Sequence, residues 1–123
     1  TKELAENITT HCTAIAAISN ICIPFMSKGC HIVNIASQAA FLPLPYMNLY
    51  AATKAFVYSY TRSLKSELKS SGIKVTAVCP GWIKTNLLPE TLNGKKVTYP
   101  FIAKAENVAK KAIKDPLFGN NAT

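Results

Sequence analysis

The hydrophobic positions along the chain fall into long segments with helical spacing and short, nearly continuous ones. Helical spacing predicts helices over residues 3–26 and 48–70, and a shorter amphipathic helix over residues 105–114. Nearly continuous apolar runs at residues 31–36 and 74–79 predict strands buried on both faces, as in a parallel sheet. The order helix, strand, helix, strand, helix indicates right-handed crossovers and an open α/β sheet.

The segments between these elements are predicted to be loops and turns. Residues 82–103 are expected to form an extended loop with a helical turn, and residues 118–121 are expected to form a turn. A doubly wound nucleotide-binding sheet usually has about six strands, whereas the pattern predicts only a pair. Residues 1–123 are therefore expected to be a single partial domain and, with no initiator Met at Thr1, a piece of a longer protein.

The composition is that of a folded globular chain. Of its 123 residues, 49% are hydrophobic and 16% are charged, which excludes a disordered segment. No uninterrupted apolar run reaches the roughly 18 residues needed to span a bilayer. The most apolar helical stretch, residues 12–26, also contains Pro24. We therefore expect no membrane span and no signal peptide.

The charge is strongly basic, with a formal net charge of +8 at pH 7. Residues 62–123 carry most of it, with eleven Lys and Arg against four acidic residues. This bias suits an anionic ligand such as a nucleotide phosphate, and an acidic segment elsewhere would balance it equally well. Nucleic-acid binding is not expected, because the basic residues are scattered and no nucleic-acid motif accompanies them.

The cysteines indicate a reducing environment rather than a disulfide framework. None forms a Cys-x-x-Cys pair, and three lie in apolar segments, where a free thiol packs as a small hydrophobic group. We therefore expect a cytoplasmic protein. A zinc site would need four ligands, and Cys12, Cys30, His11 and His31 are the candidates. Their spacing matches no zinc-binding pattern, so no metal is expected. The four cysteines are Cys12, Cys22, Cys30 and Cys79.

Three polar side chains are predicted to meet where the first strand ends. Ser37 follows that strand, and ligands of open α/β sheets bind at the carboxyl ends of the strands. Tyr50 and Lys54 lie four residues apart at the start of the next helix and so share one face. A tyrosine hydroxyl has a pKa of about 10, and a nearby ammonium group lowers such a pKa. The set is suited to general acid–base chemistry at a carbonyl or alcohol carbon.

The Tyr-x-x-x-Lys spacing alone is weak evidence, because an exposed tyrosine beside a solvated lysine would look the same. Its context is more specific. A serine lies thirteen residues before the tyrosine, and the second strand ends in Pro-Gly-Trp-Ile-Lys-Thr at residues 80–85. With Ile-Val-Asn-Ile-Ala-Ser at residues 32–37 and Tyr-Ala-Ala-Thr-Lys-Ala at residues 50–55, the chain resembles the short-chain dehydrogenase/reductase family over residues 11–85.

The resemblance implies a Rossmann-like, doubly wound α/β fold of which only the C-terminal portion is present. It implies an NAD(P)(H)-dependent oxidoreductase in which Tyr50 is the general acid/base, Ser37 orients the substrate and Lys54 binds the nicotinamide ribose. NADP is favoured as the cofactor by the branch resemblance and the basic charge, with NAD as the alternative. The residues expected to line the nicotinamide end of the cofactor are Pro80, Gly81, Ile83 and Thr85.

The chain departs from the family pattern in two ways. The glycine-rich turn that binds the cofactor phosphates is absent, since no two glycines are close enough to form it. Counted back from Pro24, His11 occupies the position where the family usually has an asparagine. We treat His11 as a catalytic candidate, because a neutral imidazole has one donor and one acceptor and so partly replaces an amide. Alternatively, His11 blocks a helix kink at this position or is a substitution without consequence.

Two functions remain open. The first is the interconversion of a hydrophobic ketone and a secondary alcohol, which is implied by resemblance to the 17-beta-hydroxysteroid dehydrogenase and 3-ketoacyl reductase branch. The apolar loop at residues 41–47 would line such a substrate site or simply pack in the core. The second is a truncated, non-catalytic remnant that acts as a dimerisation module. The family usually pairs its subunits through the helices predicted at residues 3–26 and 48–70, so a homo-oligomer is expected in either case.

Overall fold

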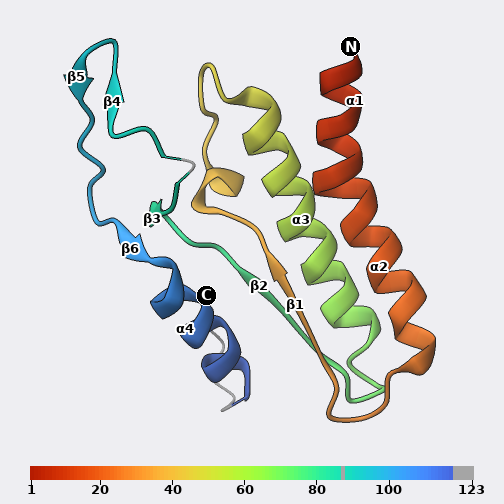
Figure 1. The fold of residues 1–123 in the computed structure, drawn as a ribbon. Coiled ribbons are helices and arrows are strands. Elements are labelled where there is room, and N and C mark those ends of the chain that lie inside the picture. Colours follow the sequence, from red (N-terminus) through yellow and green to blue (C-terminus); the bar gives the residue numbers. More distant parts are fainter. Residues whose placement is uncertain (87, 118–123) are drawn as a thin grey trace. The chain divides into compact units, whose positions relative to one another are not determined.

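The structure, a computed structural model, describes residues 1–86 and 88–117. It forms two compact units, Thr1–Cys79 and the segment that starts at Pro80. The first unit carries the two predicted strands and the helix between them, and the second carries four short strands and the last helix (Figure 1).

One continuous helical segment runs from Lys2 to Phe25 in the first unit (Figure 1). Its parts are α1 (Lys2–Ile8), a π-helical turn (Thr9–Thr13), α2 (Ala14–Cys22) and a 3-10 turn (Ile23–Phe25). The helix predicted over residues 3–26 is confirmed. The π-helical turn was not predicted. Pro24 fits the first turn of the closing 3-10 segment, where its missing N–H leaves no hydrogen bond unmade.

The helix Lys2–Phe25 is long and apolar enough to cross a membrane by the criteria of length and composition. Only 11% of its most apolar 18-residue window is buried inside the protein. The expectation that no stretch reaches this length is therefore wrong, because scattered Thr, Ser and Asn residues interrupt the apolar run without making the helix polar. The core helix of a soluble protein and a signal sequence also meet the criteria of length and composition. These criteria therefore do not by themselves assign the helix to a membrane.

Two parallel strands, β1 (His31–Ile35) and β2 (Lys74–Val78), form the sheet of the first unit and confirm the two predicted strands. Their five-residue register begins with His31 opposite Lys74. The crossover between them is α3 (Asn48–Glu67), which packs against the sheet (Figure 1). The carboxyl ends of both strands therefore lie at one edge of the sheet, next to the start of α3.

The core between α3 and the sheet is centred on Leu64, Ile73 and Val75. β1 contributes Ile32 to this core. The residues of β1 from His31 to Asn34 are half-buried, and Ile35 is 46% exposed. The expected burial of β1 on both faces is therefore wrong, because α3 packs on the face that carries Ile32 and the alternate residues of the strand point away from it.

α3 ends at Glu67, three residues before the predicted end at residue 70. Leu68 leaves the helical conformation, with φ −89° and ψ 1°. The turn into β2 then requires a glycine at position 72, because Gly72 has a φ of +68°. A Cβ at that position would also lie 2.8 Å from the side chain of Lys28.

Two small strand pairs follow in the second unit. The strands are β3 (Ile83–Lys84), β4 (Thr91–Leu92), β5 (Lys95–Lys96) and β6 (Ala103–Lys104). β3 pairs with β6 in parallel, and β4 forms an antiparallel hairpin with β5. The helical turn expected within residues 82–103 is wrong for the part that the structure describes. Asn93-Gly94, both with positive φ, forms a hairpin turn there instead.

The last helix, α4 (Ala105–Leu117), confirms the helix predicted over residues 105–114 and extends it by three residues. Lys110 Nζ lies 2.6 Å from Glu106 Oε1 one turn earlier. Both side chains are exposed, so this ion pair adds little stability. The turn predicted at residues 118–121 lies outside the described residues.

Candidate active site

Ser37 lies just beyond the carboxyl end of β1. Its backbone is extended, with φ −165° and ψ 160°, and it is the N-cap of a 3-10 turn (Gln38–Phe41). The Ser37 Oγ accepts a hydrogen bond of 3.1 Å from the Ala39 N–H. Because this bond uses an oxygen lone pair, the hydroxyl proton of Ser37 stays available for a bound ligand.

Tyr50 and Lys54 lie one turn apart at the start of α3. The Lys54 Nζ is 5.7 Å from the centre of the Tyr50 ring and donates a hydrogen bond of 3.2 Å to the Ile35 carbonyl. This bond brings the ammonium group to the end of β1, two residues before Ser37. The turn is anchored by Thr53, which is 2% exposed and donates a hydrogen bond of 2.8 Å to the Tyr50 carbonyl.

The π-helical turn lies close to this lysine. His11 is its central residue and is half-buried, and the neighbouring Cys12 is buried. Burial raises the pKa of the Cys12 thiol, while the positive charge of Lys54 acts in the opposite direction, so the thiol is within electrostatic range of the ammonium group. The π-helical turn is centred on His11, and whether the residue blocks a helix kink at this position stays open. A catalytic role for His11 stays a prediction.

Cys79 follows β2 at the same edge of the sheet. The Ala36 N–H donates a hydrogen bond of 2.8 Å to the Val78 carbonyl, which continues the strand pairing one residue beyond β1. Burial raises the pKa of the Cys79 thiol, and a hydrogen bond from the backbone of Ser37 partly opposes this rise. The ends of both strands therefore meet at Ser37.

We expect the cysteine thiols to react with iodoacetamide in an order set by exposure and pKa. Cys22 is exposed and should react before Cys12 and Cys79, whose raised pKa leaves less thiolate at neutral pH. Raising the pH above the ordinary thiol range should speed the reaction of the latter two. Mass spectrometry over time measures the order, with the urea-unfolded protein as control. Faster labelling of Cys12 than of Cys22 in the folded protein would contradict the buried position of Cys12.

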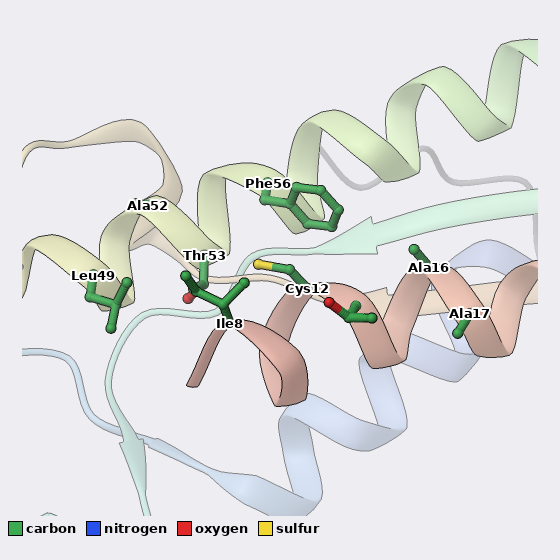
Figure 2. A pocket seen from close by; sticks show the side chains of 9 residues that line it. Ile8, Cys12, Ala16, Ala17, Leu49, Ala52, Thr53 and Phe56 are labelled. Carbon is green, nitrogen blue, oxygen red and sulfur yellow. The ribbon is translucent and has the colours of Figure 1, made fainter. Parts of the chain in front are cut away.

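An open apolar groove of about 580 Å³ lies between the N-terminal helix and α3 (Figure 2). The Cys12 sulfur points toward α3 in this view, so the groove adjoins the region of Lys54. Its lining residues are Ile8, Cys12, Thr13, Ala16, Ala17, Leu49, Ala52, Thr53 and Phe56. The groove presents almost no polar group, which suits an apolar occupant rather than a charged one.

The residues expected to line the nicotinamide end belong to the second unit. They are Pro80, Gly81, Ile83 and Thr85. Their contact with a cofactor stays a prediction. Within that unit the Trp82 ring lies 5.1 Å from the Tyr99 ring, and the Tyr99 hydroxyl donates a hydrogen bond of 2.9 Å to the Pro89 carbonyl. This pair fixes the loop that follows Gly81.

The described part of the chain holds no group of three or more His, Cys, Asp or Glu side chains placed to bind a metal ion. His31, one of the side chains considered as a zinc ligand, has its Nε2 3.0 Å from the Thr76 hydroxyl oxygen on the neighbouring strand. Burial is the main reason that the pKa of His31 is lowered, and Lys74 lowers it further. His31 is thus a neutral partner within the sheet at neutral pH.

Asn34 and Thr61 join β1 to α3 near the site and were not among the candidate residues. The Asn34 side chain on β1 donates a hydrogen bond of 3.0 Å to the Thr61 hydroxyl on α3. The available signal was an asparagine within an otherwise apolar strand, because a polar side chain in the interior is stable only with a hydrogen-bond partner. The partner itself cannot be found from the sequence pattern, since it lies 27 residues further along the chain.

The family model described as short chain dehydrogenase matches residues 1–96 of this chain. The very-long-chain 3-oxoacyl-CoA reductase of Rattus norvegicus is 37% identical over 112 residues, which cover 87% of this chain and 33% of the relative. The uncharacterized oxidoreductase YhdF of Bacillus subtilis (strain 168) is 33% identical over 97 residues, which cover 79% of this chain and 34% of the relative. The chain thus spans about a third of the length of these curated relatives.

Solved structures match the fold over a larger share. A short-chain dehydrogenase from Sphingobium yanoikuyae in complex with NADPH has a TM-score of 0.69 and 33% identity, and the match covers 88% of this chain and 42% of that one. A dehydrogenase/reductase from Sinorhizobium meliloti 1021, with 22% identity, has a TM-score of 0.83 over 100% of this chain and 52% of that one. The two units therefore contain elements of a Rossmann-like α/β fold that correspond to about half of such structures.

Proposed function

The chain belongs to the short-chain dehydrogenase family, and from this premise we propose that it carries the catalytic part of an NAD(P)(H)-dependent oxidoreductase. The reaction interconverts a ketone and a secondary alcohol by hydride transfer. The observation that carries the proposal is the position of Lys54, which lies beside Tyr50 and is bonded to the end of β1, two residues before Ser37. In this proposal the chain is the C-terminal portion of the fold.

Each of the three residues has a role that its contacts support. The Ser37 hydroxyl donates a hydrogen bond to the substrate oxygen, since its own oxygen already accepts the Ala39 N–H. Tyr50 gives a proton to that oxygen during reduction and takes it back during oxidation. Lys54, whose Nζ lies 5.7 Å from the centre of the Tyr50 ring, binds the ribose of the nicotinamide beside that tyrosine.

The donors present fit the nicotinamide-ribose end of the cofactor. An ammonium group has three N–H donors, and Lys54 uses one of them on the Ile35 carbonyl, which leaves two for ribose hydroxyls. When bound, NADPH supplies the hydride. The adenosine half would be held by the glycine-rich turn, which these 123 residues do not contain.

NADP(H) is proposed over NAD(H), and a hydrophobic ketone or alcohol as the substrate. The solved relative at 33% identity is a complex with NADPH, and the rat relative at 37% identity is named as a 3-oxoacyl-CoA reductase. Both support the branch that contains 17-beta-hydroxysteroid dehydrogenases and 3-ketoacyl reductases. Cys12, Cys22, Cys30 and Cys79 are free thiols, which supports a reducing, cytoplasmic location.

The full protein should consume NADPH in the presence of a hydrophobic ketone, and Ser37→Ala should lower kcat/KM for the ketone by about 10²- to 10³-fold, as loss of one hydrogen bond to the reacting oxygen does. Loss of NADPH absorbance measures the rate, and quenching of protein fluorescence measures cofactor binding. A matched control is Ser59→Ala, on an exposed position of α3. Unchanged kcat/KM in Ser37→Ala would contradict the role of Ser37.

A second candidate function, a dimerisation module, is favoured by the apolar groove between the N-terminal helix and α3. Exposed apolar side chains flank it, among them Ile8 and Phe56. In this proposal a second copy of the chain packs its own two helices on the groove. Binding of NADPH that is lost in Lys54→Ala would exclude a purely non-catalytic remnant.

If this groove is the subunit interface, Ala52→Arg should convert the oligomer to a monomer, because the exposed Ala52 lines the groove and an arginine would place an unpaired charge in the contact. Light scattering coupled to gel filtration measures the mass. Ser71→Arg, in the exposed turn after α3, serves as the control and should leave the mass unchanged. An Ala52→Arg protein that remains an oligomer would place the interface elsewhere.

A further inference from the structure

A chain of two hydrogen bonds, the first partly buried and the second buried, connects β1 to α3 three residues before Ser37. The Asn34 Nδ2 donates to the Thr61 Oγ1 over 3.0 Å, and the Thr61 hydroxyl donates in turn to the Val57 carbonyl over 2.6 Å. Thr61 is 1% exposed and Val57 is 0% exposed. The Thr61 end of the link is therefore enclosed between the strand and the helix, while the bond from Asn34 is partly buried.

This link is directional, whereas the contacts around it are not. The core beside it consists of Leu64, Ile73 and Val75 with Ile32 packed against them. Apolar side chains of this kind tolerate a shift of a helix along a sheet, because hydrophobic burial has no preferred direction. A hydrogen bond from Asn34 to Thr61 weakens steeply with distance and angle. The bond thus selects one position of α3 along β1.

In this position of α3, Ser37 and Lys54 have the same position along the strand direction. From Asn34 to Ser37 the strand rises by roughly 10 Å, and from Thr61 back to Lys54 the helix rises by roughly 10.5 Å. The helix runs antiparallel to β1, since Lys54 bonds to Ile35, which lies nearer the strand end than Asn34 does. Ser37 and Lys54 therefore lie at about the same distance from the bond between Asn34 and Thr61, measured along the strand.

We propose that Asn34 and Thr61 are positioning residues that set the register between β1 and α3, and through it the placement of Tyr50 and Lys54 against Ser37. The catalytic part of this inference rests on the proposed function. A slip of α3 by one turn would move its residues by about 5.4 Å along the strand. That displacement exceeds the reach of the hydrogen bond between Lys54 and the Ile35 carbonyl.

The test separates position from stability by replacing both partners at once. In the full protein, Asn34→Leu combined with Thr61→Val exchanges the bonded pair for apolar groups of similar size, which leaves no buried polar group unpaired. The thermal midpoint should stay close to that of the wild type, while kcat falls by about tenfold to a hundredfold, since misplacement by about 1 Å has effects of this size. KM should change much less than kcat.

Two further variants complete the series. Thr61→Ser keeps the hydroxyl and should retain the wild-type kcat. Ile73→Val, a small truncation of the core beside the sheet, should lower the thermal midpoint and leave kcat unchanged. An unchanged kcat in the double variant, or a kcat that follows thermal stability across all the variants, would overturn the inference.

Crystal structures of the same proteins test the register without any turnover. The contact of 3.2 Å between Lys54 Nζ and the Ile35 carbonyl should be lost or lengthened in the double variant and kept in Ile73→Val. If the wild-type protein shows no hydride transfer, the proposed function fails while this structural comparison still decides the inference. An intact contact in the double variant would overturn it.

Discussion

Tyr50→Phe in the full protein should lower kcat by about 10²- to 10⁴-fold, the contribution of a positioned general acid or base. The substitution removes the hydroxyl and keeps the ring. It also keeps the local structure, because α3 is anchored at this point by the hydrogen bond from the Thr53 hydroxyl to the Tyr50 carbonyl, a backbone contact. NADPH should therefore bind with unchanged affinity, as measured by fluorescence quenching, while its oxidation in the presence of a ketone is lost.

The same substitution at Tyr58 is the matched control. Tyr58 lies two turns further along α3, and its hydroxyl accepts a hydrogen bond of 3.1 Å from the guanidinium group of the exposed Arg62. Tyr58→Phe should keep kcat within about twofold, because surface substitutions of this kind have small effects. Retained turnover in Tyr50→Phe would mean that another group transfers the proton, and His11 would be the next residue to replace.

Leu64→Ala should lower the free energy of unfolding by about 2–5 kcal/mol, the range for a buried leucine whose removal leaves a cavity. Leu64 is 5% exposed and packs with Ile73 and Val75 at the centre of the core between α3 and the sheet. Leu64 lies on the same buried face of α3 as Val57 and Thr61. Urea unfolding followed by circular dichroism measures the loss.

Leu92→Ala provides the matched comparison, because it deletes the same atoms from a side chain that is 62% exposed. It should change the free energy of unfolding by no more than about 0.5 kcal/mol. Equal losses from the two leucines would mean that Leu64 does not hold the core together.

The regular elements of the first unit could be predicted because each has a local signal. The nearly continuous apolar residues of β1 and β2 and the helical spacing of α3 are visible within short windows. The Asn93-Gly94 hairpin also had its signal, since this dipeptide favours the required positive φ values. The π-helical turn had none, because the side-chain pattern of residues 9–13 is compatible with an ordinary α-helix.

The candidate site could be predicted only in part. Tyr50 and Lys54 share a helix face by spacing alone, and Ser37 follows a strand that composition identifies. The contact between Lys54 and the Ile35 carbonyl joins residues 19 apart and depends on how α3 returns to the sheet. Pairings of this kind are set by tertiary packing. Local pattern does not encode them, and the same holds for the proximity of Cys12 and Lys54.

β1 and β2 pair only with each other in the part of the chain that the structure describes. Each strand therefore presents one row of backbone N–H and C=O groups without a neighbouring strand, and such edges act as templates for strand addition. A preparation of residues 1–123 alone should self-associate in a concentration-dependent way. A separate polypeptide that pairs a strand with either exposed edge should suppress this self-association, with recovered solubility as the readout.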